Sequence, residues 1–534
     1  MRPETGLPVA GLLLGMAALW YRLGLVWMCA LILVALGLAA GAAHHFNRWP
    51  LFLAFLLWWR LRFQSFVEEL FCNNTAKGAQ RDQVTKGNNQ AKEKEEEEAV
   101  QEKDYPFRDN EVEEEEGKEV VYQSGGASTS FSSSDQLRPR IKGATLNKLI
   151  EKITTIEAPD PELVTAFLLT YRGFCTPQQL LELLVLRYKV PLQRESRYRE
   201  AIQARVQYIT KKWAEDHYYD FENDEQLLKR LNAFVSLMSR SSSTAITKFA
   251  DVLRLYLSKA SKNEKLAMRR VHGETLPAPK VPYGGHTGPI SNVMEVNPLE
   301  FARQLTILEF QCFVKIQPKE CMGLAWSKKD KQEKAPNVLF FIESFNRISK
   351  WVVSQILAEE ALKQRAKVLE HFIQILLHCK ELQNYNAMME INAGLHSSSV
   401  GRLKQTWKLL PTKLRVSYEE SFSDMMQSNY KKLRDMLLSS PPPCIPYIGV
   451  FLTDLTFIED GNKDMLTSHP HLINFEKRQM QSRVIEQIKL YQKKAYALQP
   501  VDRLQTFIRT LSSELSDEAA YQRSLQLEPR QQKT

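Results

Sequence analysis

The sequence predicts an all-α protein with one or more transmembrane helices near its N-terminus. Three observations lead to this prediction. Apolar residues recur at helical spacing through two long regions, 138–262 and 293–530. Residues 1–67 contain long apolar runs with few charges. Between these parts, residues 68–137 are too polar to bury a core of their own.

The best membrane candidate runs from Leu23 to Ala43 and reads LGLVWMCALILVALGLAAGAA. These 21 residues carry no charge. As a helix they would extend about 30 Å, which matches the hydrocarbon core of a bilayer. Trp58 and Trp59, followed by two arginines, close a later apolar run in the pattern of a membrane interface. We therefore predict that residues 1–67 form a membrane anchor, with the number of spans left open.

The arginines around this stretch indicate its orientation. Arg48, Arg60 and Arg62 follow it, whereas Arg2 and Arg22 precede it. Because positive charge is enriched on the cytoplasmic side of membranes, the C-terminal region is expected in the cytoplasm. The small residues AAGAA also fit a cleaved signal peptide, which would export the rest of the chain. The cytoplasmic character of the downstream region, described below, favours the anchor.

Residues 68–137 are predicted to be a disordered linker that is acidic and rich in serine. Between Lys92 and Glu119 there are fourteen acidic and five basic residues, and the run SGGASTSFSSSD follows. The net charge of +9 is therefore carried elsewhere, spread over helical segments. No dense basic run or zinc-finger spacing accompanies it, which argues against nucleic acid as a partner.

The region 138–262 predicts a first helical domain, and 263–292 a connector. In the stretch APDPELVTAFLLTYRGFCTPQQLLELLVLRY, Pro161 suits the first turn of a helix and Gly173 breaks the apolar pattern. A second helix follows Pro177. The connector contains GETLPAPKVPYGGHTGP, whose glycines lack the order of a phosphate-binding loop.

The region 293–530 predicts a second and larger helical domain. One of its apolar faces consists of Val368, Phe372, Ile375, Leu376 and Cys379. The seven cysteines of the chain are widely spaced and include no CxxC pair, which is typical of a reducing compartment. The sequence therefore predicts no metal site, and nothing in it requires a cofactor.

A helical hairpin is expected after the run PPPCIP in this second domain. Its first helix has an apolar face, which consists of Ile448, Phe451, Leu455 and Ile458. Another face carries a polar stripe, which consists of Thr453, Thr456 and Asp460. Gly461 ends this helix, and the second helix carries Val484, Ile488 and Tyr491 on one face. Periodicity alone also fits two ordinary packed helices whose polar residues face solvent.

Several motifs of the second domain resemble the catalytic domain of Ras guanine-nucleotide exchange factors of the Son-of-sevenless type. They are MEVNPLEFARQLTILEF, NVLFFIESFNRISKWV, PPPCIPYIGVFLTDLTFIEDGN, LINFEKRQMQSRVIEQIKLYQ and the closing LQLEPR. The region 138–262, with LVTAFLLTYRGFCTPQQLLELL, is similar to the Ras-exchanger motif domain that precedes the catalytic domain in that family. The resemblance leaves the N-terminal part of the chain outside it.

The resemblance implies two helical domains and a protruding hairpin that wedges open the nucleotide site of a Ras-family small GTPase, of Ras or Rap type. Such exchange involves no covalent chemistry and no cofactor. The stripe of Thr453, Thr456 and Asp460 would face the GTPase and act as the catalytic wedge. Asp460 stands where the family has a longer glutamate, and Thr456 where the Ras-specific prototype has a bulkier apolar residue. Both differences affect reach and the choice of GTPase.

Five more residues match family positions that bind the GTPase. They are Arg303 and Thr306 in FARQLT, Asn346 in ESFNRI, and Lys477 and Arg478 in NFEKRQ. The aromatic residues nearby are expected to belong to the core or to support the hairpin, namely Tyr430, Phe451 and Phe457. An anchor on the membrane would suit this function, because Ras-type GTPases are lipidated and meet their regulators at a membrane surface.

Two other readings of the sequence stay open. One is a membrane scaffold that binds small GTPases without promoting exchange, which the shorter side chains at positions 456 and 460 would permit. The other is a hydrolase or metal enzyme. The chain contains no GxSxG or HExxH motif to support that second reading.

Overall fold

The computed structural model describes eight stretches of the chain. They are residues 104–107, 118–123, 140–157, 159–241, 243–261, 290–422, 428–513 and 515–530. Most of these residues lie in helices, in agreement with the helical part of the predicted fold. A small three-stranded sheet is the exception, and the sequence did not predict it.

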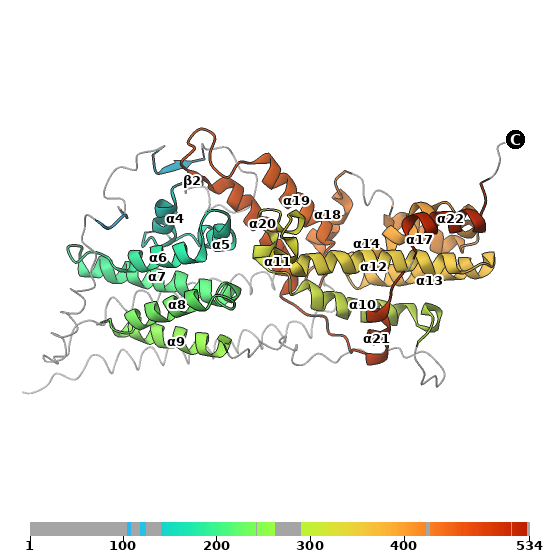
Figure 1. The fold of residues 1–534 in the computed structure, drawn as a ribbon, viewed down its shortest axis with the longest axis horizontal. Helices are drawn as coiled ribbons and strands as arrows, with labels where there is room; N and C mark the ends of the chain where they lie inside the picture. The colour runs from blue at the N-terminus through green and yellow to red at the C-terminus, as the bar shows by residue number, and fades with distance from the viewer. Residues whose placement is uncertain are drawn as a thin grey trace, which may run out of the picture. The chain divides into compact units, whose positions relative to one another are not determined.

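Residues 140–261 form the first helical domain (Figure 1). Its α-helices are α4 (Leu146–Ile153), α5 (Pro161–Thr170), α6 (Pro177–Tyr188), α7 (Ser196–Asp216), α8 (Glu225–Met238) and α9 (Thr244–Ser261). Asp160 caps α5, and Pro161 occupies its first turn as expected. α6 begins at Pro177 because Thr176 and Gln179 form a capping box.

The core of the first domain surrounds Trp213 of α7, which is completely buried. Its ring lies 4.7 Å from that of Phe221, measured between centroids. Its indole Nε1 donates a hydrogen bond of 2.8 Å to the buried carboxylate of Asp220. The hydroxyl of Tyr171 and the guanidinium of Arg172 donate to the same carboxylate. The buried charge of Asp220 is therefore fully hydrogen bonded, as a charge in a core has to be.

Two short segments inside the predicted linker, 68–137, pack against the first domain. Tyr105 and Phe107 are buried beside Arg187, whose guanidinium is completely buried. Arg187 donates to the Tyr105 hydroxyl at 2.9 Å and to Thr154 Oγ1 at 3.0 Å, and it lies 5.1 Å from the centre of the Phe107 ring. The two rings thus cover a cation that would otherwise be solvated, which explains why these residues depart from the predicted disorder.

Replacing Phe107 with alanine should lower the free energy of unfolding by about 3–5 kcal/mol, because the change removes a fully buried ring and uncovers Arg187. Urea denaturation of the purified protein measures this loss. Asp104→Ala is the control, because Asp104 is exposed in the same segment and should cost less than about 0.5 kcal/mol. Equal effects of the two changes would contradict the docking of this segment.

The three-stranded sheet connects the first domain with a distant part of the sequence. Its strands are β1 (Val120–Tyr122), β2 (Ile141–Ala144) and β3 (Ile473–Asn474), in the order β1-β2-β3. Both pairs are antiparallel, with Val120 opposite Ala144 and Gly143 opposite Asn474. Because β3 directly precedes helix α20, the sheet ties the first domain to the predicted hairpin.

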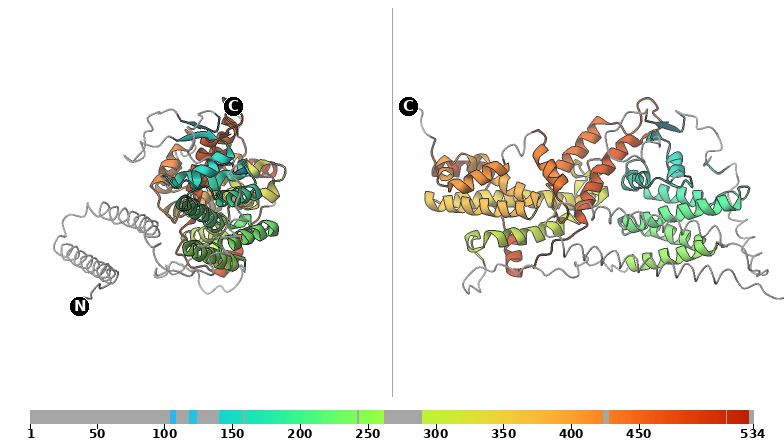
Figure 2. Two further views of the ribbon diagram at one scale, coloured as in Figure 1. Left: turned by 90° about the vertical axis from the view of Figure 1, so that its left-hand side faces the viewer. Right: turned by 180° about the vertical axis from the view of Figure 1, so that it is seen from behind.

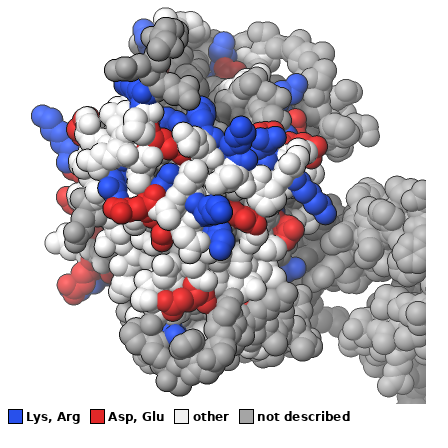
Figure 3. Space-filling view, turned by 90° about the vertical axis from the view of Figure 1, so that its right-hand side faces the viewer, with Lys and Arg blue, Asp and Glu red and all other residues white. Residues whose placement is uncertain are grey.

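The second domain begins after residue 290 and contains the remaining helices. They are α10 (Pro298–Phe313), α11 (Lys331–Lys334), α12 (Pro336–Ala358), α13 (Leu362–Glu381), α14 (Tyr385–Leu395), α15 (Ser398–Gly401), α16 (Lys404–Lys408), α17 (Thr412–Phe422), α18 (Lys431–Ser439), α19 (Ile448–Gly461), α20 (Phe475–Gln492), α21 (Asp502–Thr510) and α22 (Asp517–Leu527). On the face that Figure 3 shows, basic and acidic side chains are interspersed among uncharged ones.

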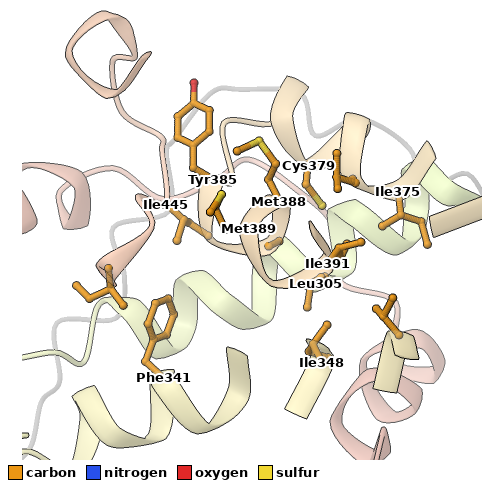
Figure 4. Packing of buried hydrophobic residues seen from close by; sticks show 14 of the residues in the cluster. Leu305, Phe341, Ile348, Ile375, Cys379, Tyr385, Met388, Met389, Ile391 and Ile445 are labelled. Atoms are coloured by element: carbon orange, nitrogen blue, oxygen red, sulfur yellow. The ribbon is translucent and has the colours of Figure 1, made fainter. Parts of the chain in front are cut away.

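The core of the second domain forms where α10, α12, α13 and α14 meet (Figure 4). Trp351 of α12 stacks on Phe301 of α10 with 5.7 Å between ring centroids, and its ring lies 5.2 Å from Phe372 of α13. The predicted apolar face of α13 is buried in this core, from Val368 to Cys379. Helical spacing therefore identified the correct face of α13.

Two glutamates are buried in this core, Glu309 of α10 and Glu390 of α14. Asn384 and Asn386 donate hydrogen bonds of 2.6 and 2.8 Å to Glu309. Burial raises the pKa of both carboxyls, and the charge of Glu309 raises that of Glu390 further. Among the described residues Glu390 has no donor to stabilise an ionised form. The proton of the pair therefore resides on Glu390.

A Glu390→Gln change should remove part of the pH dependence of stability. Because the folded-state pKa is raised, the folded protein holds more protons than the unfolded chain, and the free energy of unfolding falls as pH rises above the usual glutamate range of about 4.3. Glutamine is neutral at every pH, so the variant should lose less stability between about pH 5 and pH 8. Denaturation curves at both pH values test this, and an unchanged pH slope would contradict it.

The predicted transmembrane helices require a correction. Among the described residues no helix is both long and apolar enough to cross a membrane. The longest of these helices, α12 with 23 residues, carries Glu343, Arg347 and Lys350 along its length. The stretch from Leu23 to Ala43, on which the prediction was based, lies outside the described residues.

Candidate functional site

Helices α19 and α20 form the expected hairpin and lie side by side in both views of the ribbon (Figures 1 and 2). Ile448, Phe451 and Leu455 of α19 are buried against the second domain. Asn474 caps α20 by accepting the backbone N–H of Lys477. The apolar faces predicted for the two helices therefore hold them on the domain surface.

The far end of α20 is fastened to the domain core. The Tyr491 hydroxyl donates to the backbone carbonyl of Leu437 in α18 at 2.8 Å. The Gln492 side chain donates to the carbonyls of Phe313, the last residue of α10, and of Ile316, which follows that helix, at 2.8 and 2.9 Å. The base of the hairpin is therefore fixed by side chains that bond to the backbone of two other elements.

The polar stripe lies at the surface of α19. Thr453 and Thr456 are half-buried and Asp460 is exposed. The Thr456 hydroxyl donates to the carbonyl of Leu452 at 2.8 Å, so its oxygen can still accept a hydrogen bond. The fold thus leaves this edge of the hairpin accessible to a partner.

Ion pairs on both sides of the stripe fix the rotation of α19. Asp454 receives two hydrogen bonds of 2.6 and 2.7 Å from the guanidinium of Arg434 in α18. Glu459 accepts from Lys477 at 3.2 Å and from Gln481 at 2.8 Å, both in α20. Residues 454 and 459 are about 140° apart around the helix axis. Contacts on two sides therefore hold α19, at Asp454 and at Glu459, and the polar stripe lies between these two positions.

Lys477 and Arg478 hold the hairpin together from within, and each side chain is only 2% exposed. Both bond to Asp464 in the loop between the two helices, at 2.8 and 2.6 Å. Burial raises the pKa of Asp464, but these hydrogen bonds more than offset it, so that the pKa lies below its usual value. The two cations join α20 to α19 and to the loop, and both are buried; their contact with the GTPase stays a prediction.

The first domain also contacts α20. Arg478 donates to the backbone carbonyl of Gly173 at 3.2 Å, and its guanidinium lies 5.9 Å from the Phe174 ring centre. A Cβ at position 173 would lie 2.8 Å from the Nη1 of Arg478, so only glycine permits this approach. Helix α5 packs along α20 in addition to the pairing of β2 with β3. The first domain thus supports the second helix of the hairpin.

Comparison with known proteins agrees with this architecture. The RasGEF domain matches residues 300–479, and the RasGEF N-terminal motif matches residues 140–234. The protein son of sevenless of Drosophila melanogaster is 33% identical over 446 residues, which cover 74% of this chain and 27% of that protein. Ras guanine nucleotide exchange factor A of Dictyostelium discoideum is 34% identical over 410 residues, which cover 74% of this chain and 66% of that protein.

The chain belongs to the Ras guanine-nucleotide exchange factor family. Both domains of the family are present in the order that the sequence motifs indicated. The chain spans between 27% and 66% of the length of these relatives, which therefore contain further sequence outside the match. The hairpin formed by α19 and α20 is the element that the sequence analysis predicts to contact the GTPase.

Three more residues of the predicted GTPase contact occupy different environments. Asn346 of α12 is exposed. Arg303 of α10 is partly buried and forms an ion pair of 3.3 Å with Glu300. Thr306 is completely buried, donates to the carbonyl of Ala302 and accepts from Asn384 at 3.0 Å. Asn346 is thus on the surface, whereas Thr306 belongs to the buried network of Glu309.

Phe457 is a surface residue that the sequence analysis assigned to hairpin support. Its side chain is 65% exposed, whereas Phe451 is buried and Tyr430 packs against Tyr447. Phe457 follows Thr456 and lies one turn before Asp460, so it belongs to the accessible edge of an exchange-factor hairpin. Its spacing from Phe451, six positions, could have shown that the two rings point in different directions.

Lys477→Met should loosen the hairpin, because it removes the ammonium that joins Glu459 to Asp464 while keeping the side-chain volume. Amide hydrogen exchange across residues 448–461 should become faster, since Glu459 then keeps only its hydrogen bond from Gln481 and α19 is held less firmly on this side. Lys494→Met is the matched control, because Lys494 is exposed just after α20. Unchanged protection of α19 in the Lys477 variant would contradict the role of this network.

Proposed function

We propose that this chain promotes the release of GDP and the loading of GTP on a Ras-family small GTPase at a membrane surface. The observation that carries the proposal is the accessible edge of Thr453, Thr456, Phe457 and Asp460 on a helix gripped from both sides. A rigid projecting edge suits a protein that pushes apart the nucleotide site of a partner. Membership of the exchange-factor family supports the same assignment.

The proposed reaction is a displacement without covalent chemistry. A GTPase that holds its nucleotide with picomolar affinity gains about 16 kcal/mol from binding, so spontaneous release is slow. A protein that binds the empty GTPase better than the loaded one must weaken nucleotide binding by the same factor. Preorganisation helps here, because an edge that is already rigid loses little entropy when it binds.

Each residue of the edge has a distinct proposed task. The carboxylate of Asp460 pairs with GTPase groups that otherwise hold phosphate, and Thr456 enters the region of the magnesium ion. Both side chains are short for these tasks, whereas Phe457 projects beside them with 65% of its side chain exposed. Phe457 therefore supplies apolar contact area to the complex, as aromatic anchors do at other interfaces.

The choice between Ras-type and Rap-type partners rests on this same edge. Thr456 is a small side chain at a position where the Ras-specific prototype has a bulky apolar one. The next residue, Phe457, carries an aromatic ring. We expect the preferred GTPase to be the one whose switch regions can accommodate the ring of Phe457. These GTPases are lipidated and lie on the cytoplasmic face of membranes, so we place the catalytic region in the cytoplasm.

Replacing both Thr456 and Asp460 with alanine should slow release of fluorescent GDP from the preferred GTPase by at least about tenfold, which corresponds to about 1.4 kcal/mol of the barrier. The assay is run on Ras-type and Rap-type GTPases loaded with the labelled nucleotide. The double change Asp502→Ala and Thr506→Ala is the matched control, because both residues are exposed on α21.

The control should exchange nucleotide at the rate of the unchanged protein. If the unchanged protein binds a GTPase of the panel but does not speed nucleotide release from any of them, the chain is a scaffold and the proposal is wrong. If the protein is active and the double variant keeps full activity, the assigned edge is wrong.

A further inference from the structure

A cavity of about 290 Å³ lies where α12, α15 and α22 meet, and none of the edge residues of α19 lines it. The residues that line it are Lys350, Val353, Ser397, Ser398, Ser399, Ser513, Leu515, Asp517 and Ala520. This volume is close to the lower end, about 300 Å³, of sites that hold small molecules. Three of the nine lining residues are apolar and four are serines.

Two serine hydroxyls of the cavity, those of Ser397 and Ser513, accept hydrogen bonds from the backbone and still have a proton to donate. Ser397 Oγ already accepts the backbone N–H of Val400, and Ser513 Oγ accepts that of Leu515, each at 3.3 Å. Each of these two hydroxyls can therefore still donate one hydrogen bond. Within the described part of the chain, neither hydroxyl donates to a protein acceptor.

Ser399 and Lys350 add to this excess of donors. Ser399 is only 3% exposed, yet its hydroxyl forms no hydrogen bond to the described residues and faces the cavity. Its oxygen is not among the buried side-chain atoms without a partner, so solvent reaches it and a ligand that accepts from this hydroxyl can replace water there. Lys350 is exposed at the cavity and forms no ion pair with the described residues. An anion with several acceptor atoms would match these donors.

We propose that this cavity binds a phosphate monoester group. Such a group brings a negative charge and three strong acceptor oxygens, which match the ammonium of Lys350 and the serine hydroxyls that line the cavity. The carboxylate of Asp517 lies at the same cavity and opposes the anion, so it limits the affinity. The phosphate can come from a free small molecule or from a phosphorylated serine of a protein, since the recognised chemistry is the same.

Calorimetric titration of the purified protein with inorganic phosphate and with a phosphoserine peptide tests the proposal directly. Lys350→Met should weaken binding by about tenfold, which is the value of one good charge-assisted contact. Asp517→Asn should strengthen it several-fold, because it removes a like charge. Both residues are exposed, so neither change threatens the fold.

Ser399→Ala should also weaken binding, whereas Ser512→Ala should not, because Ser512 is exposed and does not line the cavity. Tighter binding of the phosphopeptide than of inorganic phosphate would assign the site to a phosphorylated protein, and similar binding of both would assign it to a small molecule. Absence of binding at millimolar concentrations, or equal affinities of the Lys350 and Asp517 variants, would overturn the proposal. These measurements do not depend on exchange activity.

Discussion

The structure depends most on two buried cations at the start of α20. Lys477 and Arg478 are withdrawn from water and paired with Glu459 and Asp464 and with a backbone carbonyl of the first domain. Buried ion pairs are a poor source of stability, because desolvation offsets much of their attraction. What the two cations provide is a defined position of α19, α20 and the loop relative to one another, because their hydrogen bonds join all three. The accessible edge of α19 inherits its rigidity from this arrangement.

The same network makes the two domains of the family act as one support. Gly173 allows the backbone of the first domain to approach Arg478 closely, and β2 pairs with β3 just before α20 begins. On the other side, Arg434 of α18 grips Asp454. The hairpin is therefore braced by both domains, while Phe457 and Asp460 on its outward edge are exposed. Rigidity behind the edge and openness in front of it are both needed for a wedge.

Sequence reasoning succeeded where a periodic signal and a cap occur together. The start of α5 at Pro161, the start of α6 at Pro177 and the apolar faces of α13 and α19 follow from local patterns that a helix imposes. It failed for the sheet and for the segment of Tyr105 and Phe107. Strands of two to four residues have no measurable period, and their partners lie far away in the chain. The transmembrane prediction was made for residues that the structure does not describe.

The sequence by itself determined the helices, their order and the polar stripe of α19, because a repeat of 3.6 residues is visible within a single segment. Only the tertiary structure decided which charged and aromatic residues face a partner. It placed Lys477, Arg478 and Thr306 inside and Phe457 outside. The physical reason is that burial of a side chain depends on what packs above it. The part of the chain that covers these residues belongs to another helix, or to the first domain some three hundred residues earlier in the sequence.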